Sequence, residues 1–223
     1  MLSTKNLQLM PNKDDLQRIC KAISVLDAIF CDEWEFRYYS YNSKWAEGEE
    51  FCEMRDGSGD HMLILFLKNN CIINGLAKEY CSQVASKEDL TLGMPEIYND
   101  FIFGEPVSSR GTDFCLWTNN GGEWEVGNIR MNDDGSEELL NIFDGNPETY
   151  INWAYEYFFD HTQDEDEEED DYKAKPTSFE PVFEIYQEKK LTKEMVLLLD
   201  KNFDDWKRLE EDLKEINYHY DFN

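Results

Sequence analysis

The spacing of apolar side chains predicts a long amphipathic helix near the start of the chain. Between residues 13 and 30, apolar positions recur every three or four residues, which is the repeat of one helix face. Asn12 precedes this stretch and can cap a helix. Asp14 and Asp15 follow it, where carboxylates stabilise the positive end of the helix dipole. We therefore expect a helix over residues 13–30.

The apolar pattern then changes to a period of two, which is typical of strands. In "EWEFRYYSY", Trp34, Phe36 and Tyr38 would share one face of a half-buried strand. The unbroken apolar run "HMLILFL" predicts a strand that is covered on both faces. Together with a strand at about residues 49–55 and another in "CIINGLA", these segments predict a four-stranded meander.

The stretch "MRDGSGDH" between two of these strands is the nearest approach to a metal or phosphate loop. A calcium loop of the EF-hand type that began at Asp56 would need glycine at its sixth position and glutamate at its twelfth. His61 and Leu67 occupy those positions, and no lysine follows the glycines as a phosphate loop requires. Gly57 and Gly59 instead suit a tight reversal, so we predict a hairpin bend.

The second half of the chain predicts a further hairpin and more helices. "TDFCLW" and "EWEVGNIRM" read as two strands around the turn "TNNGG". "SEELLNIF" and "PETYINWAYEYFF" read as helices, separated by Gly145 as a helix end and Asn146 as the next cap. The expected fold class is α+β: a mostly antiparallel sheet, meander plus hairpin, with helices packed on one face and a helical C-terminal tail.

The sequence predicts three consecutive regions. An α+β domain over residues 1–160 is followed by an acidic linker over 161–176 and a C-terminal helical segment over 177–223, which we expect to pack on the same domain. The linker contains the run "DEDEEEDD" at 164–171, and such runs are usually solvated and disordered. Weak calcium binding by this run is the alternative.

The charge balance narrows the choice of partners. The chain has 49 acidic and 21 basic residues, for a formal net charge of −28. Nucleic-acid binding is therefore not expected, because phosphate contacts need clustered lysine and arginine. A basic protein is the natural partner, and the strong self-repulsion favours a monomer.

The expected cellular compartment is inferred from the membrane and secretion signals that the sequence lacks. No apolar run approaches the roughly 18 residues that a membrane helix needs, and the N-terminus lacks the apolar core of a secretory signal. The six cysteines show no paired C-x2-C spacing, which argues against a zinc site and fits reduced thiols. We expect a cytoplasmic protein that does not contact membranes.

No motif indicates a catalytic residue, a cofactor or a metal ion. The chain contains no G-x-S-x-G and has three histidines. Cys52 could face His61 across the hairpin, but a buried cysteine beside an exposed histidine is the more common arrangement. A hydrolase-like enzyme built from dispersed carboxylates and His61 remains the alternative to a protein without enzymatic activity.

Aromatic residues near the first strand and the later hairpin are candidates for a protein-binding surface. Exposed tyrosine, tryptophan and arginine are the residue types that dominate protein-binding hot spots. For Tyr39 and Tyr41, packing under a helix is the favoured interpretation, and exposure in a binding surface is the alternative. The candidate surface consists of Arg37, Tyr39, Tyr41, Trp45, Trp117 and Trp124.

Three segments carry a resemblance to a known group of proteins. "WEFRYYSYNSKW", "MRDGSGD" and "DGSEELLNIFDGNPETYINWAYEYF" resemble a group of uncharacterised bacterial cytosolic proteins over about residues 30–160. This resemblance implies no assigned activity. In composition the chain is also similar to bacterial immunity proteins that neutralise toxins. The expected function is therefore a non-enzymatic, acidic interaction module, including immunity-type binding of a basic protein.

Overall fold

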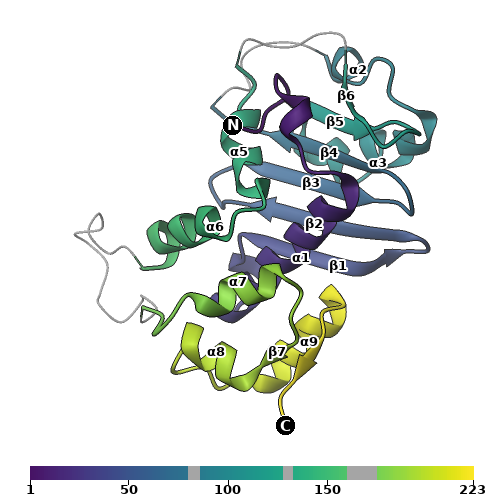
Figure 1. Ribbon diagram of the computed structural model, residues 1–223. Helices are drawn as coiled ribbons and strands as arrows, with labels where there is room; N and C mark the ends of the chain where they lie inside the picture. Colours follow the sequence, from purple (N-terminus) through teal and green to yellow (C-terminus); the bar gives the residue numbers. More distant parts are fainter. Residues whose placement is uncertain (80–85, 128–132, 160–174) are drawn as a thin grey trace.

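The protein is built on an antiparallel sheet whose six strands follow one another in sequence order (Figure 1). The computed structural model describes residues 1–79, 86–127, 133–159 and 175–223. The sheet strands are β1 Tyr39–Ala46, β2 Glu49–Arg55, β3 His61–Phe66, β4 Cys71–Leu76, β5 Phe114–Thr118 and β6 Trp124–Val126; β7 Leu191–Thr192 and β8 Tyr220–Asp221 form a separate parallel pair. The predicted α+β class, a meander continued by a hairpin, is confirmed.

The predicted N-terminal helix forms with the expected bounds. Helix α1, Lys13–Phe30, crosses one face of the sheet, and the Oδ1 atom of Asn12 accepts the Asp15 backbone N–H at 3.0 Å (Figure 1). The other α-helices are α2 Lys87–Leu90, α3 Asn99–Phe103, α4 Val107–Arg110, α5 Ser136–Leu140, α6 Pro147–Ala154, α7 Glu180–Tyr186, α8 Lys193–Leu199 and α9 Trp206–Ile216. Short 3-10 turns are η1 Leu7–Leu9, η2 Trp34–Phe36, η3 Glu96–Tyr98 and η4 Asn141–Phe143, and η5 Tyr155–Phe159 is a π-helix.

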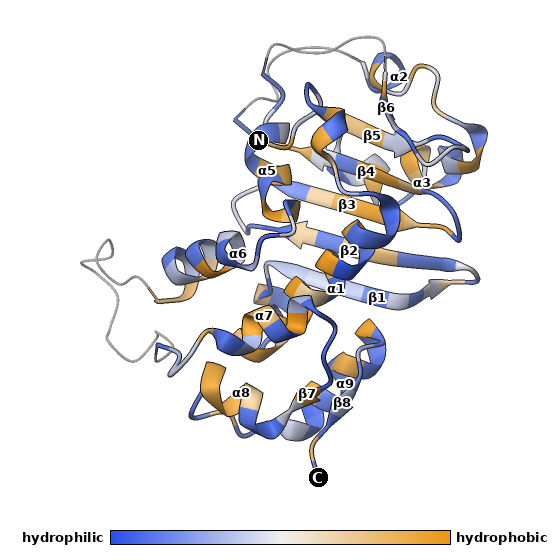
Figure 2. Cartoon of the chain, in the orientation of Figure 1, coloured by the Kyte–Doolittle hydropathy of each residue, from blue (hydrophilic) through white to orange (hydrophobic). Residues whose placement is uncertain are grey.

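Alternation along the strands divides the side chains between two apolar clusters. On β3, Met62, Ile64 and Phe66 join the large core under α1, whereas Leu63 and Leu65 join a smaller cluster with α3. We name these sides of the sheet the α1 face and the α3 face. The apolar run of β3 is thus explained by cover on both sides, and Figure 2 shows its strongly apolar colour.

The C-terminal helices pack on α1 and beside the first strand. Helices α7, α8 and α9 all contact α1, and α9 also contacts β1. An ion pair joins α9 to the start of β1, where the Asp212 Oδ2 atom lies 2.7 Å from the Arg37 guanidinium. The acidic run at 164–171 lies outside the described residues. Within them, no helix is long and apolar enough to cross a membrane.

The predicted start of the first strand was wrong. Trp34 and Phe36 belong to the 3-10 turn η2 and are exposed, and β1 begins at Tyr39. The Arg37 side chain is responsible in part, since its Nε–H donates to the backbone carbonyl of Cys31 at 3.0 Å and holds the chain in a turn. The alternation of Trp34, Phe36 and Tyr38 therefore does not place these side chains on one strand face.

Candidate functional site

Part of the α3 face is left open by the short helices, and it is hollowed into two adjoining cavities. One has a volume of about 410 Å³ and lies between Trp34 and Trp45; we name it the aromatic groove. The other has a volume of about 480 Å³ and lies beside His61; we name it the arginine pocket. Arg55 and Arg110 line both cavities, so the two form one continuous candidate site.

The aromatic groove has an exposed tryptophan on each side. Trp34 is 51% exposed and Trp45 is 43% exposed, which is unusual for side chains of this size. The Trp45 ring stacks on Phe51, with ring centroids 4.4 Å apart. Because Phe51 belongs to the apolar cluster of the α3 face, Trp45 continues that cluster to the surface.

Arg55 holds the other tryptophan in place. Its guanidinium lies 3.9 Å from the centroid of the Trp34 ring, in a cation–π arrangement. The same guanidinium donates to two backbone carbonyls of the turn, at 2.5 Å to Trp34 and 3.3 Å to Arg37. The exposed indole is therefore held in contact with Arg55 of strand β2.

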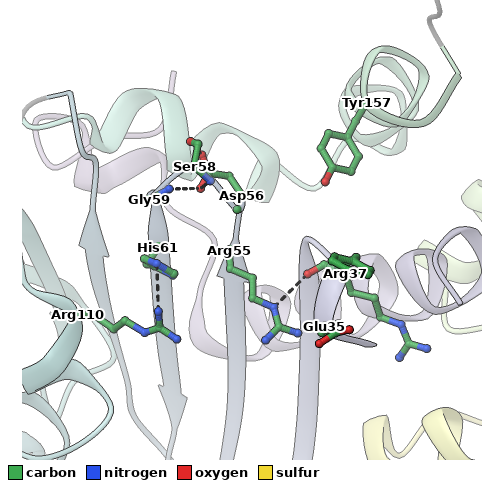
Figure 3. Close-up of a pocket in the computed structure, with 11 residues that line it drawn as sticks. Glu35, Arg37, Arg55, Asp56, Ser58, Gly59, His61, Arg110 and Tyr157 are labelled. Carbon is green, nitrogen blue, oxygen red and sulfur yellow. Dashed lines mark hydrogen bonds between the residues drawn. The ribbon is translucent and has the colours of Figure 1, made fainter. Parts of the chain in front are cut away.

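The floor of the site carries one carboxylate between two guanidinium groups. The Glu53 carboxylate lies 3.9 Å from Arg55 and 3.9 Å from Arg110, too far for close hydrogen bonds. Arg110 also meets His61, with its Nη1 atom 3.4 Å from the imidazole Nε2 atom (Figure 3). Burial and the charge of Arg110 lower the pKa of His61 below its ordinary value.

The predicted bend between β2 and β3 is confirmed and forms the rim of the arginine pocket. Asp56 organises it: its Oδ1 atom accepts the backbone N–H groups of Ser58, Gly59 and Asp60 at 2.8–2.9 Å (Figure 3). Partial burial alone would raise the pKa of Asp56, but a hydrogen bond from the Ser58 hydroxyl, together with the backbone N–H groups, lowers it below its ordinary value. Asp56 therefore serves the turn, and Gly57 and Gly59 take the positive φ angles that the turn needs.

The candidate surface predicted from the sequence is mostly covered. Arg37 is buried against Asp212. Tyr39 and Tyr41 are buried in the α1-face core, so packing under a helix is the correct interpretation for both. Trp45 alone among the six residues has an exposed side chain.

The side chains of the two tryptophans in the later hairpin are also covered, one fully and one in part. Trp117 is 1% exposed, and its Nε1–H group donates to Glu125 at 3.2 Å. Trp124 is half-buried on the α1 face, and its indole donates to the Pro11 carbonyl at 2.7 Å. Binding to a partner stays a prediction, and of the six predicted residues Trp45 is the one whose side chain is exposed enough to contact a partner.

Two exposed residues of the site were missed from the sequence. Trp34 and Phe36 were assigned to a buried strand face, yet Phe36 is 64% exposed and Trp34 lines the groove. The local signal was ambiguous, because alternating acidic and aromatic residues fit an exposed turn as well as a strand. The contact that decides the matter comes from Arg55, 21 residues further along the chain.

The geometry offers little to a nucleophilic or metal-dependent mechanism. Cys52 lies in the α1-face core, whereas His61 lines the arginine pocket on the α3 face, so these two side chains do not face one another. His61 meets a guanidinium, where a catalytic base would be oriented by a carboxylate. Over the described ranges, no group of three or more His, Cys, Asp or Glu side chains could hold a metal ion.

No protein-family model, curated protein or solved structure matches the chain. The resemblance of the sequence to uncharacterised bacterial proteins therefore stays a prediction.

Proposed function

We propose that this protein is a non-enzymatic interaction module that binds a basic protein partner through the aromatic groove. The observation that carries the proposal is the pair of exposed tryptophans, Trp34 and Trp45, on the two sides of a cavity of about 410 Å³. Tryptophan and arginine are the commonest residues of protein-binding hot spots, and Arg55 and Arg110 lie in the same groove.

The groove itself is lined by Arg55 and Arg110, so the support for a basic partner comes from the charge of the chain around it. The chain as a whole carries a formal charge of −28, and exposed Glu33, Glu35 and Glu47 flank the two tryptophans in sequence. An acidic field attracts a basic protein over a distance of about one Debye length, roughly 8–10 Å at physiological salt. Association with such a partner should therefore be fast at low salt and slower at high salt.

The order of the site supports affinity. A side chain that is mobile before binding loses conformational entropy when it is fixed in an interface. Stacking on Phe51 already restrains Trp45, and Arg55 already restrains Trp34. Both indoles can thus be buried by a partner at a small entropic cost.

The proposal includes a cytoplasmic, monomeric protein, and immunity-type neutralisation of a basic toxin is one form that it can take. Five of the six cysteines lie in the described residues, and none of these five forms a disulfide, as a reducing compartment would favour. The hydrolase-like alternative depends on His61, and among the described residues no carboxylate is hydrogen-bonded to its imidazole to orient it.

The test compares capture by matched variants. Three immobilised proteins are compared: the intact chain, Trp45→Ala and Leu197→Ala. Each is exposed to native cytosol at low ionic strength, and the captured proteins are quantified by mass spectrometry. Leu197 on α8 is 40% exposed, so it controls for the loss of an exposed apolar side chain. We expect a basic protein on the intact chain and on the Leu197 variant. Loss of a central hot-spot residue costs about 2 kcal/mol or more of binding free energy. The basic protein should therefore bind Trp45→Ala at least about 30-fold more weakly than it binds the intact chain.

Binding is then measured by calorimetry with the purified partner at several salt concentrations. Equal affinity for the intact chain and the Trp45 and Trp34 alanine variants would contradict the proposal. So would capture that is independent of salt.

A further inference from the structure

The arginine pocket stands out because it gathers positive charge in a strongly acidic protein. Arg55, His61 and Arg110 all line it, in a chain whose formal charge is −28 (Figure 3). Glu53 is the carboxylate that lies between Arg55 and Arg110, and it must serve both guanidinium groups. Asp56 and Glu35 also line the pocket and offset part of this charge, but the Asp56 Oδ1 atom is already engaged by backbone N–H groups of the bend.

Arg110 is the arginine whose guanidinium has N–H groups that can still donate to a ligand. Arg55 uses its Nε and Nη2 groups to hold backbone carbonyls of η2. The Arg110 side chain, by contrast, is 42% exposed and lies 3.9 Å from Glu53, beyond close hydrogen-bonding distance. Its guanidinium therefore keeps N–H groups that can donate to a ligand in the pocket.

The contact between Arg110 and His61 defines where a ligand would sit. A guanidinium can only donate, so the imidazole Nε2 atom accepts, and the neutral ring carries its proton on Nδ1. The Nδ1 atom is buried and has no hydrogen-bond partner among the described residues. When His61 is protonated, Nε2 becomes a second donor beside the guanidinium. The N–H groups of Nε2 and of the guanidinium then face each other, and an oxygen anion between them would accept from both and offset the repulsion of the two positive charges.

We propose that the arginine pocket binds a compact oxyanion, a carboxylate or a phosphate-like group, between Arg110 and His61. The cavity of about 480 Å³ is larger than one such group, so the anion is the end of a larger ligand. Phe36 and Tyr157 also line the pocket and can contact an apolar part of that ligand. The arginine pocket shares Arg55 and Arg110 with the aromatic groove, but the ligand proposed for it is an oxyanion, and its binding can be measured without a protein partner.

Proton uptake accompanies this binding. Burial and Arg110 lower the pKa of His61, while Glu53, Asp56 and Asp60 act in the opposite direction. A bound oxyanion stabilises the protonated ring, so its affinity rises as the pH falls. The rise can reach about tenfold per pH unit where one proton is taken up.

The experiment uses the full chain and two probes, sulfate and acetate, added at constant ionic strength in sodium chloride. Sulfate keeps its charge between pH 5.5 and 8, so any pH dependence belongs to the protein. Binding is followed by NMR through the backbone amides and the histidine rings, of which the chain has three. We expect saturable shifts confined to His61, Arg110 and the bend at residues 57–59. The probe that saturates the site distinguishes a phosphate-like ligand from a carboxylate.

Matched variants make the result specific. Arg110→Gln removes the exposed guanidinium and should weaken binding about tenfold or more, because a charge-assisted hydrogen bond is lost. Lys207→Gln removes the same charge from a side chain that is 89% exposed on α9, and it should leave binding unchanged. Shifts spread over the surface, equal losses in both variants or no saturable shift with either probe would overturn the proposal. An affinity for sulfate that does not rise towards pH 5.5 would exclude the role of His61.

Discussion

The two faces of the sheet are made by the same strands but perform different tasks. The α1 face is closed: its apolar side chains pack under α1, and the C-terminal helices pack on α1 in turn. On the α3 face, the short segment from η3 to α4 covers only the central strands. The uncovered part carries Trp34 and Trp45, together with the charged side chains of Glu53, Arg55 and Arg110. Burial on one face thus provides stability, and incomplete cover on the other leaves a surface for recognition.

The largest expected difference in stability is between alanine variants of two phenylalanines, one on each face. Phe66 is 1% exposed in the α1-face core, whereas Phe36 is 64% exposed beside the arginine pocket. Phe66→Ala should lower the free energy of unfolding by roughly 3–5 kcal/mol, through lost burial and the cavity it leaves. Phe36→Ala should change it by less than about 0.5 kcal/mol. Urea unfolding of both variants checks this, and similar losses would show that the two faces contribute alike.

A buried carboxylate makes the α1 face sensitive to pH. Asp27 on α1 is fully buried and accepts hydrogen bonds from the Tyr39 backbone N–H at 2.8 Å and from the Tyr150 hydroxyl at 2.9 Å. Burial raises the pKa of Asp27 from 3.8 to about 7, although these hydrogen bonds oppose the shift. Between those two values the folded protein holds a proton that the unfolded chain has lost. The contribution of this group to stability therefore falls as the pH rises from about 4 to 7.

Asp27→Asn removes that pH dependence, because an amide stays neutral. Its oxygen can still accept from Tyr39, and its amino group can donate to Tyr150. Relative to the intact chain, the variant should gain stability between pH 4.5 and pH 8, by roughly 4 kcal/mol at most, since one pKa unit corresponds to about 1.4 kcal/mol. Denaturant unfolding at both pH values measures the difference. A difference that is constant with pH would show that Asp27 stays charged when folded.

The smallest expected effect concerns the bend at the rim of the arginine pocket. Gly57 has a φ of +77°, and nothing lies within 4 Å of the place where a Cβ atom would stand. Gly57→Ala should therefore cost only the strain of the left-handed backbone, about 1–2 kcal/mol. Gly57→Asn should cost less, because asparagine tolerates this conformation. Thermal unfolding of the pair checks the order, and equal losses would point to a side-chain clash instead of backbone strain.

Elements defined by local chemistry could be predicted well. Helix α1 has the bounds expected from its apolar period and its Asn12 cap, and α6 begins after the expected Asn146 cap. The bend at residues 56–60 follows from two glycines between two apolar strands. In each case the deciding interactions lie within a few residues, so the pattern carries the information.

The candidate site could be predicted only in part. Trp45 was identified from its residue type, and the exposed Trp34 was mistaken for a buried strand residue. Four other members of the predicted surface, Arg37, Tyr39, Tyr41 and Trp117, are buried by helices and strands that lie far away in the sequence. Residue type indicates what a side chain can bind, but not whether it is exposed.

The sequence by itself determined the N-terminal helix, the order of the six sheet strands, the α+β class and the acidic character of the protein. These properties depend on apolar period, helix caps, turn residues and composition. The tertiary structure alone decided which side chains meet on the open part of the α3 face. Arg55 reaches Trp34 across 21 residues and Arg110 reaches His61 across 49, and such contacts exist only after the sheet has formed.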